Sequence, residues 1–155
     1  MTPGDTASEI RYQPIGVVHS PHVADDHVPP RRIERRGVEG TIEVFPGYTE
    51  GLRDLEGFSH IILLCHLHLS SGYSLTVKPP SDTRTHGLFA SRSPRRPNPI
   101  SLTVVRLRSI EGNVLHVVDL DIIDGTPLLD IKPYFASTYD GDEVRTGWME
   151  ARRGR

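Results

Sequence analysis

The sequence lacks several features that define common classes of protein. Cys65 is its only cysteine, which excludes an intrachain disulfide and thiolate-built zinc sites and is typical of a reducing compartment. No apolar run approaches the ~20 residues that a membrane-spanning helix needs. The first residues lack the basic-then-apolar pattern of a secretory signal. We therefore expect a cytoplasmic protein with no membrane partner.

Familiar nucleotide and hydrolase motifs are also missing. The chain has no G-x-x-x-x-G-K-[ST], no G-x-G-x-x-G and no G-x-S-x-G. These absences exclude a P-loop, a classical dinucleotide-binding site and the nucleophile elbow of α/β-hydrolases. Any nucleotide-like ligand must therefore be bound by another architecture.

Three histidines raise the question of a metal site. His60, His66 and His68 share parity in one apolar stretch, and a His-x-His pair on a strand can ligate a metal. A convincing third ligand and a carboxylate are missing nearby. We therefore expect no metal, and interpret these residues as histidines of a core or of a pocket.

The periodicity of the chain is mostly that of β-strands. Thirteen prolines and fourteen glycines divide it into short segments, and period-two or fully apolar runs predict strands. The predicted strands are Thr41–Phe45, Ile61–Leu69, Ile100–Leu107 and Val114–Leu120. For Ile61–Leu69 a buried helix is the alternative, and a short helix is expected at Thr49–Leu55.

A sheet of many short strands has edge strands with unpaired backbone groups, and closure into a barrel removes these edges most completely. We therefore expect a mainly β, antiparallel-rich, single-sheet barrel with one or two short helices; a sandwich is the alternative. One domain over residues 10–150 and a loose tail over residues 1–9 complete the predicted organisation.

Charge is distributed unevenly along the chain, although the net charge is only −2. Six arginines and no acid lie between Arg84 and Arg108, and a smaller basic group covers residues 31–36. Residues 119–143 are strongly acidic. Arginine suits carboxylates, phosphates and stacked bases, so RNA binding on one face is the functional interpretation. A solvated surface is the alternative.

The stretch from Gly87 to Leu102 is the most informative. Pro94, Pro97 and Pro99 fix three backbone angles within six residues and disfavour helix for the residues before them. The predicted result is a stiff, extended loop that presents its polar side chains in defined directions. These side chains are Arg92, Arg95, Arg96 and Asn98. A preorganised site for an anionic or planar aromatic ligand is one interpretation; a stiffened turn with surface arginines is the other.

The same stretch carries a resemblance. FASRSPRRPNPISLTVVRL resembles the signature of the TsaA-like (TrmO) family, and five other blocks agree in order. They are IGVVHSPH, PPRR, GLRDLEGFSHIILL, VKPP and LDIIDGTPLLDIKPY. The resemblance implies an S-adenosylmethionine-dependent methyltransferase that modifies N6 of threonylcarbamoyl-adenosine beside the anticodon of tRNA. It also implies a β-barrel unlike the Rossmann methyltransferases, and a homodimer whose cofactor pocket is completed near the interface.

Carried over by position, the resemblance implies a set of cofactor contacts. They are Pro30, Arg31, Arg32, His68, Leu69, Arg92, Leu102, Ile122, Ile123, Asp124 and Gly125. We expect an arginine to hold the methionyl carboxylate, Leu102 and Ile122 to wall the adenine, and Asp124 to accept from the ribose or the amine. Backbone groups of Ile123 and Gly125 are expected to read the adenine edge.

Roles on the substrate side are expected in the arginine-rich stretch. Asn98, or a carbonyl of the Pro97–Pro99 loop, is the expected acceptor that orients the reacting N–H. Arg84, Arg95 and Arg96 are expected to contact RNA phosphates or to stack on bases.

The sequence departs from the family pattern at three positions and in its length. The family commonly has glutamine where this chain has Arg32 and Leu69, and glycine where it has Ser101. The longer bacterial members carry a C-terminal domain thought to help with tRNA, which we do not expect here. Two alternative functions stay open: methylation of a small molecule or another RNA on the same fold, and a non-catalytic RNA-binding module.

Overall fold

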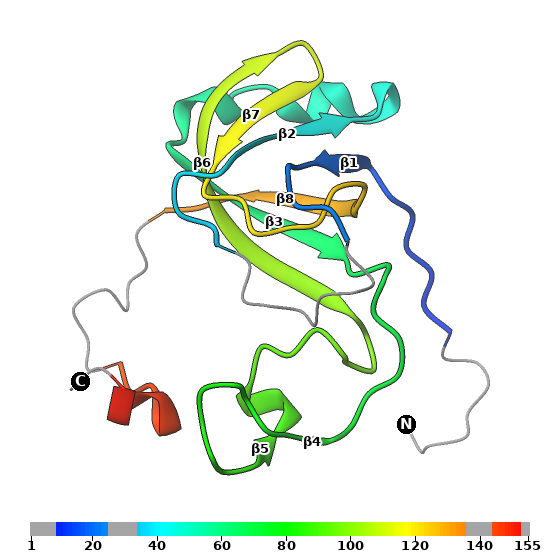
Figure 1. Cartoon of the computed structure of the whole chain (residues 1–155). Helices are drawn as coiled ribbons and strands as arrows, with labels where there is room; N and C mark the ends of the chain where they lie inside the picture. The colour runs from blue at the N-terminus through cyan, green and yellow to red at the C-terminus, as the bar shows by residue number, and fades with distance from the viewer. Residues whose placement is uncertain (1–8, 25–33, 136–143, 153–155) are drawn as a thin grey trace.

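The computed structural model describes residues 9–24, 34–135 and 144–152. Six strands form a closed antiparallel barrel in the order β1-β2-β7-β6-β3-β8 (Figure 1). Their bounds are β1 Gly16–His19, β2 Glu39–Val44, β3 His60–His66, β6 Ile100–Glu111, β7 Val114–Val118 and β8 Pro127–Pro133. The predicted single-sheet barrel is confirmed.

Alternation of side chains builds the core of this barrel. Along β3, Ile61, Leu63 and Cys65 point inward and are fully buried, as expected for a strand of period two. On the other face of β3, Ile62 and Leu64 are half-buried, and β3 pairs with β6 on one side and β8 on the other. The predicted strand is confirmed as far as His66, residues 67–69 lie beyond its end, and the helical alternative for Ile61–Leu69 is wrong.

Short 3-10 helices connect the strands. The expected helix at Thr49–Leu55 is found as η1, Pro46–Leu52, followed by η2, Leu55–Gly57. Pro46 fixes the start of η1, and Leu52 and Leu55 face the core as expected. None of the helices in the structure is long and apolar enough to cross a membrane.

A long excursion separates β3 from β6. Residues 67–99 lie outside the barrel and contain a two-stranded sheet, β4 Thr76–Val77 with β5 His86–Gly87, and η3 Leu88–Ala90. In Figure 1 this excursion is a separate layer below the barrel. The last described element, η4 Gly147–Arg152, contacts it through Trp148.

Candidate functional site at one end of the barrel

Stretches that are distant in sequence meet at one end of the barrel. Cys65, near the end of β3, pairs with Ser101 at the start of β6 and with Leu128 at the start of β8. The excursion leaves and returns here, closed by a hydrogen bond from the Leu67 N–H to the Pro99 carbonyl (2.7 Å). Residues 119–126, which join β7 to β8, cross the same end.

The β7–β8 connection, which we call the cap, closes this end of the barrel. Leu120 and Ile122 insert into the core with 0% and 4% of their surfaces exposed. Gly40 on β2 makes room for them, because a Cβ there would overlap the Leu120 side chain and the His19 carbonyl oxygen. Beyond Ile122, Ile123 is half-buried, and Asp124 and Gly125 are exposed at the surface of the cap.

Backbone hydrogen bonds fix the position of the cap turn. The Asp124 N–H donates to the His22 carbonyl (2.7 Å) and the Gly125 N–H to the Val18 carbonyl (2.8 Å). Gly125 has a φ of 80°, which glycine adopts without strain. Sequence at this turn therefore determines where the Asp124 carboxylate lies.

One oxygen of the Asp124 carboxylate is held and the other is not. Oδ1 accepts from the Ser20 N–H (2.9 Å) and lies 4.0 Å from Nδ1 of His19. The other nitrogen of His19 contacts Glu43 at 2.8 Å. Within the described residues, Oδ2 of Asp124 has no hydrogen-bond partner, so it remains for a ligand.

Some backbone groups of the cap turn are already hydrogen-bonded within the protein. The Ile123 carbonyl accepts from the Thr126 hydroxyl (2.7 Å) and the Thr126 N–H (3.3 Å). The Gly125 N–H is also engaged, as described above. These two groups hold the turn together, and the expectation that backbone groups of Ile123 and Gly125 read the adenine edge stays a prediction.

A polar corner lies inside the barrel directly beneath this surface. Thr103 is 5% exposed, and its hydroxyl donates to Asp121 of the cap at 2.9 Å. Beside it, burial raises the pKa of the Cys65 thiol to about 12, while Ser101 lowers it and Asp121 raises it. Cys65 is therefore a neutral thiol with structural rather than nucleophilic character.

The departure at Ser101 falls in this corner. Its hydroxyl is buried next to Cys65, and within the described residues it makes no hydrogen bond that meets distance and angle criteria. The side chain faces Cys65 across the β3–β6 pairing and not the open surface. Ser101 therefore changes the polarity of the interior, whereas neighbouring Leu102, 57% exposed, presents its side chain outward.

Arg96 does not lie as expected for a residue that contacts phosphates. It is half-buried, and its Nη1 donates to the carbonyls of Ser91 (2.9 Å), Ser93 (3.2 Å) and Leu88 (3.4 Å). These bonds tie one guanidinium to three backbone acceptors of the loop. Arg96 therefore braces the loop.

The other arginines of the stretch remain available to a ligand. Arg92 and Arg95 are exposed, and neither has an ion pair or a side-chain hydrogen bond within the described residues. Arg84 is 74% exposed in its side chain and lies 4.0 Å from Asp82. The positive surface expected from the sequence is thus carried by Arg84, Arg92 and Arg95.

Contacts that the sequence did not reveal hold the excursion in place. His86 contacts Asp82 at 2.9 Å and stacks on Trp148 with ring centroids 4.4 Å apart. The hydrogen bond from His86, followed by the Arg84 N–H, lowers the pKa of Asp82 to about 2. The Trp148 indole donates to the Ala90 carbonyl at 2.8 Å. The only feature of the sequence that singles out a residue of these contacts is that Trp148 is the sole tryptophan.

The three histidines of the apolar stretch are not core residues. His60, on the outward face of β3, is half-buried and contacts the Ser59 hydroxyl at 2.8 Å. His66 and His68 are exposed. The core alternative is wrong, because even-numbered residues of β3 point out of the barrel and His68 lies beyond the end of β3; the pocket alternative stays a prediction. Where the chain is described, no group of three metal-ligating side chains forms.

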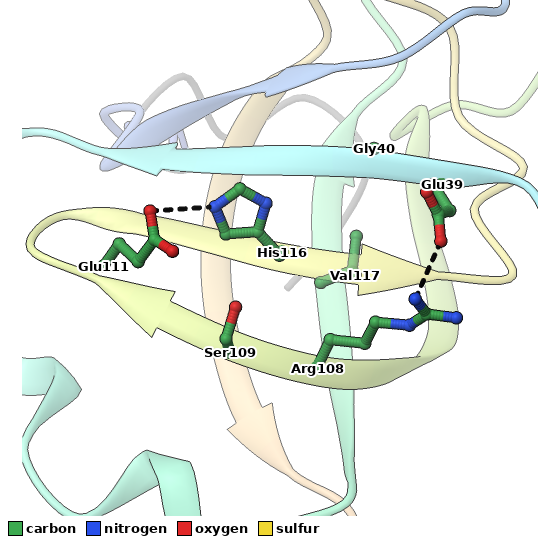
Figure 2. A pocket seen from close by; sticks show the side chains of 7 residues that line it. All are labelled: Glu39, Gly40, Arg108, Ser109, Glu111, His116 and Val117. Carbon is green, nitrogen blue, oxygen red and sulfur yellow. Dashed lines mark ion pairs between the residues drawn. The ribbon is translucent and has the colours of Figure 1, made fainter.

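Two hollows lie on other parts of the barrel. One, of ≈ 210 Å³, lies on the outer face of β2, β7 and β6, where Arg108 reaches Glu39 (3.0 Å) and His116 faces Glu111 (3.6 Å), as Figure 2 shows. The other, of ≈ 580 Å³, lies at η1 and η2 beside Ile131 of β8. Neither is lined by a residue expected to bind the cofactor.

Most of the expected cofactor residues are exposed in this single chain. His68, Leu69, Arg92, Leu102, Asp124 and Gly125 are exposed, Ile123 is half-buried, and Ile122 is buried beneath the cap. Pro30, Arg31 and Arg32 lie outside the described residues, as do residues 1–8 of the expected tail. The structure brings the β3 exit, the β6 start and the cap to one end.

These features define a class of protein: a closed six-stranded antiparallel barrel, capped at one end, with an arginine-bearing excursion inserted between β3 and β6. The model of the tRNA-methyltransferase O N-terminal domain family matches residues 17–140. The chain belongs to that family.

Individual relatives agree with the family match. The chain is 50% identical over 141 residues to a Pyrococcus abyssi protein named "Probable S-adenosyl-L-methionine-binding protein", covering 91% of this chain and 77% of the relative. It is 34% identical to the Escherichia coli tRNA (adenine(37)-N6)-methyltransferase, covering 82% of this chain and 58% of that enzyme.

A solved structure shows the same fold. The crystal structure of TrmO from Pseudomonas aeruginosa superposes with a TM-score of 0.70 at 32% identity, covering 90% of this chain and 62% of the TrmO chain. This chain therefore spans less than two thirds of the solved protein.

Proposed function

We propose that this chain is an S-adenosylmethionine-dependent methyltransferase that acts on N6 of threonylcarbamoyl-adenosine in tRNA, next to the anticodon. The supporting observation is that three separate family motifs converge at one end of the barrel: the β3 exit, the β6 start and the cap. Cys65, a buried free thiol, suits an enzyme that works in the cytoplasm.

The side chains present at this end fit the cofactor. When bound, S-adenosylmethionine supplies a methyl group activated by a sulfonium. The exposed guanidinium of Arg92 suits the methionyl carboxylate, and the unpartnered oxygen of Asp124 suits a ribose hydroxyl or the amine. Leu102, an exposed leucine on a strand, suits the face of the adenine.

Substrate orientation is the main task left to the chain. The lone pair of an adenine N6 is delocalised into the ring, so an acceptor must orient the N–H and a path must carry the proton away. The Asn98 and Pro99 carbonyls already accept from the Ile100 and Leu67 N–H groups. The Asn98 side chain, which is exposed, and the Pro97 carbonyl are therefore the acceptors that we assign to this role.

A homodimer is part of the proposal. Ile62 pairs with Val104, and Leu64 with Leu102, on the outward face of β3 and β6, which continues to Ile100, 43% exposed. An aliphatic ladder of this kind beside the cofactor surface suits an interface between two copies. We expect Ile100→Glu to shift the sedimentation of the protein toward a monomer, whereas Leu75→Glu, on the excursion, leaves it unchanged.

Methyl transfer is the direct test of the function. The purified chain, S-adenosylmethionine and tRNA containing threonylcarbamoyl-adenosine are expected to yield the N6-methylated nucleoside, detected by mass spectrometry. Cofactor binding without turnover on any tRNA pool would contradict the proposal and favour a small-molecule substrate or a non-catalytic module.

The location of the cofactor is tested by a matched pair of variants. Asp124→Asn removes one charge at the cap and is expected to weaken S-adenosylmethionine binding roughly tenfold or more, since a charged hydrogen bond is lost. Asp54→Asn makes the same change at the opposite end of the barrel, beside η2. Equal cofactor affinity in both variants, measured by calorimetry, would place the cofactor elsewhere.

A further inference from the structure

Phe89 is an exposed aromatic side chain on a fixed support. It lies in the middle of η3 with 75% of its surface exposed, whereas its neighbour Leu88 is 1% exposed. An exposed aromatic side chain on an ordered backbone offers a face on which an unpaired base can stack. Neither the cofactor set nor the proposed acceptors include Phe89.

Hydrogen bonds on both sides of Phe89 in the sequence hold the backbone of η3. The Leu88 N–H donates to the Leu75 carbonyl (2.9 Å) and the Ser91 N–H to the Leu88 carbonyl (3.0 Å). The Trp148 indole donates to the Ala90 carbonyl at 2.8 Å. The backbone that carries Phe89 is therefore ordered before any ligand arrives, which lowers the entropic cost of binding.

Arg96 fixes the ring itself. Its guanidinium carbon lies 5.8 Å from the centroid of the Phe89 ring, within the range of a cation–π contact. The same guanidinium is held by three backbone carbonyls. One partner of the ring is thus part of the protein framework, and the ring still exposes most of its surface.

The surroundings of Phe89 select the chemistry of its ligand. Arg95, which has no assigned role toward the cofactor, is exposed in the same loop, and the sequence from Arg84 to Arg108 contains no acid. An aromatic platform in a loop that also carries an exposed cation suits a planar group attached to phosphates, which is an unpaired base of RNA. An apolar protein partner would not need the cation.

We propose that Phe89 is the stacking platform for an unpaired nucleobase of the RNA substrate and that Arg96 is its positioning residue. The proposal rests on the proposed function in that it takes the substrate to be RNA. It adds a contact that lies outside the cofactor surface and specifies unpaired rather than paired nucleotides.

The test compares two RNA probes on a series of Phe89 variants. The probes are a stem-loop with unpaired adenosines and a fully paired duplex of the same length. Phe89→Ala is expected to weaken stem-loop binding roughly tenfold, the effect of removing one base-stacking aromatic, and to leave duplex binding unchanged. Phe89→Trp is expected to retain stem-loop affinity, and Phe89→Leu, which keeps apolar area without a π face, to lose most of it.

Salt dependence separates stacking from charge. Phe89→Ala removes no charge, so the slope of log affinity against log salt is expected to stay that of the wild type. Arg95→Ala is expected to reduce the magnitude of this slope by about one, the amount that corresponds to one phosphate contact. A change of slope in Phe89→Ala would overturn the stacking role.

Controls distinguish failure of this inference from failure of the proposed function. Equal stem-loop affinity for wild type and Phe89→Ala, with cofactor binding and sedimentation unchanged, overturns the platform alone. A Phe89→Ala variant that sediments as a smaller species also overturns it, because the ring then belongs to an interface between copies. A wild type that binds cofactor but neither RNA probe contradicts the tRNA function and this inference together.

Discussion

The barrel and the excursion over residues 67–99 are ordered by different means. The barrel is held by six paired strands and a core that includes Ile42, Leu63 and Leu115, all fully buried. The excursion has one two-residue strand pair and one largely buried leucine, Leu88. It relies instead on prolines, on Arg96 and on the contacts of His86 and Trp148. The stabilising core therefore lies in the barrel, and the groups proposed to contact RNA lie in the excursion.

The largest effect is expected in the barrel core. Leu63→Ala removes a fully buried side chain, and such a cavity costs about 2–5 kcal/mol of unfolding free energy. Leu75→Ala makes the same change at a position of the excursion that is 62% exposed, where we expect a change within about 0.5 kcal/mol. Urea unfolding of both variants checks this contrast, and equal losses would show that the excursion is part of the cooperative core.

A smaller, local effect is expected at Arg96. Arg96→Ala leaves three carbonyls without their charged donor, a loss of about 1–3 kcal/mol confined to the loop. Hydrogen exchange at the Ser91 amide is therefore expected to accelerate while barrel amides keep their protection. Arg95→Ala, at the exposed position directly before Arg96, serves as the control. Unchanged exchange in Arg96→Ala would contradict the bracing role.

The smallest effect is a dependence on pH within the excursion. Because the pKa of Asp82 is lowered to about 2 from 3.8, folding favours its charged form. The resulting stability is present above about pH 4 and is lost as the pH falls toward 2. Trp148, the sole tryptophan, stacks on His86 and reports the change by fluorescence. Asp82→Asn is expected to abolish this transition, and a transition that persists in the variant would exclude Asp82 as its cause.

The difference between the two regions also explains what the sequence could predict. Alternation along residues 100–107 and 114–120, and the two apolar faces of residues 61–69, were sufficient to predict strands and closure, because strand pairing depends on a period of two. The tighter 3-10 geometry of η1 was not predicted, since periodicity over seven residues does not separate 3-10 from α-helical turns.

Contacts in the excursion left little trace in the sequence. Arg95 and Arg96 are neighbours of the same type, yet one faces solvent and the other binds backbone carbonyls. Their roles depend on the path of a proline-rich backbone that carries no periodic signal. The pairing of His86 with Trp148 joins residues 62 positions apart, and the polar corner at Ser101 arises only from the register of β3 on β6.

Hydrogen exchange with and without S-adenosylmethionine tests the central claim most directly, namely that the cofactor binds at the capped end of the barrel. We predict that added cofactor slows exchange in three stretches: residues 67–69, the start of β6 around Leu102, and the cap at residues 122–125. Residues of η1 and η2 at the opposite end are expected to stay unchanged. Protection at η1 and η2, or around Glu39 and His116, with none at the cap would contradict the account.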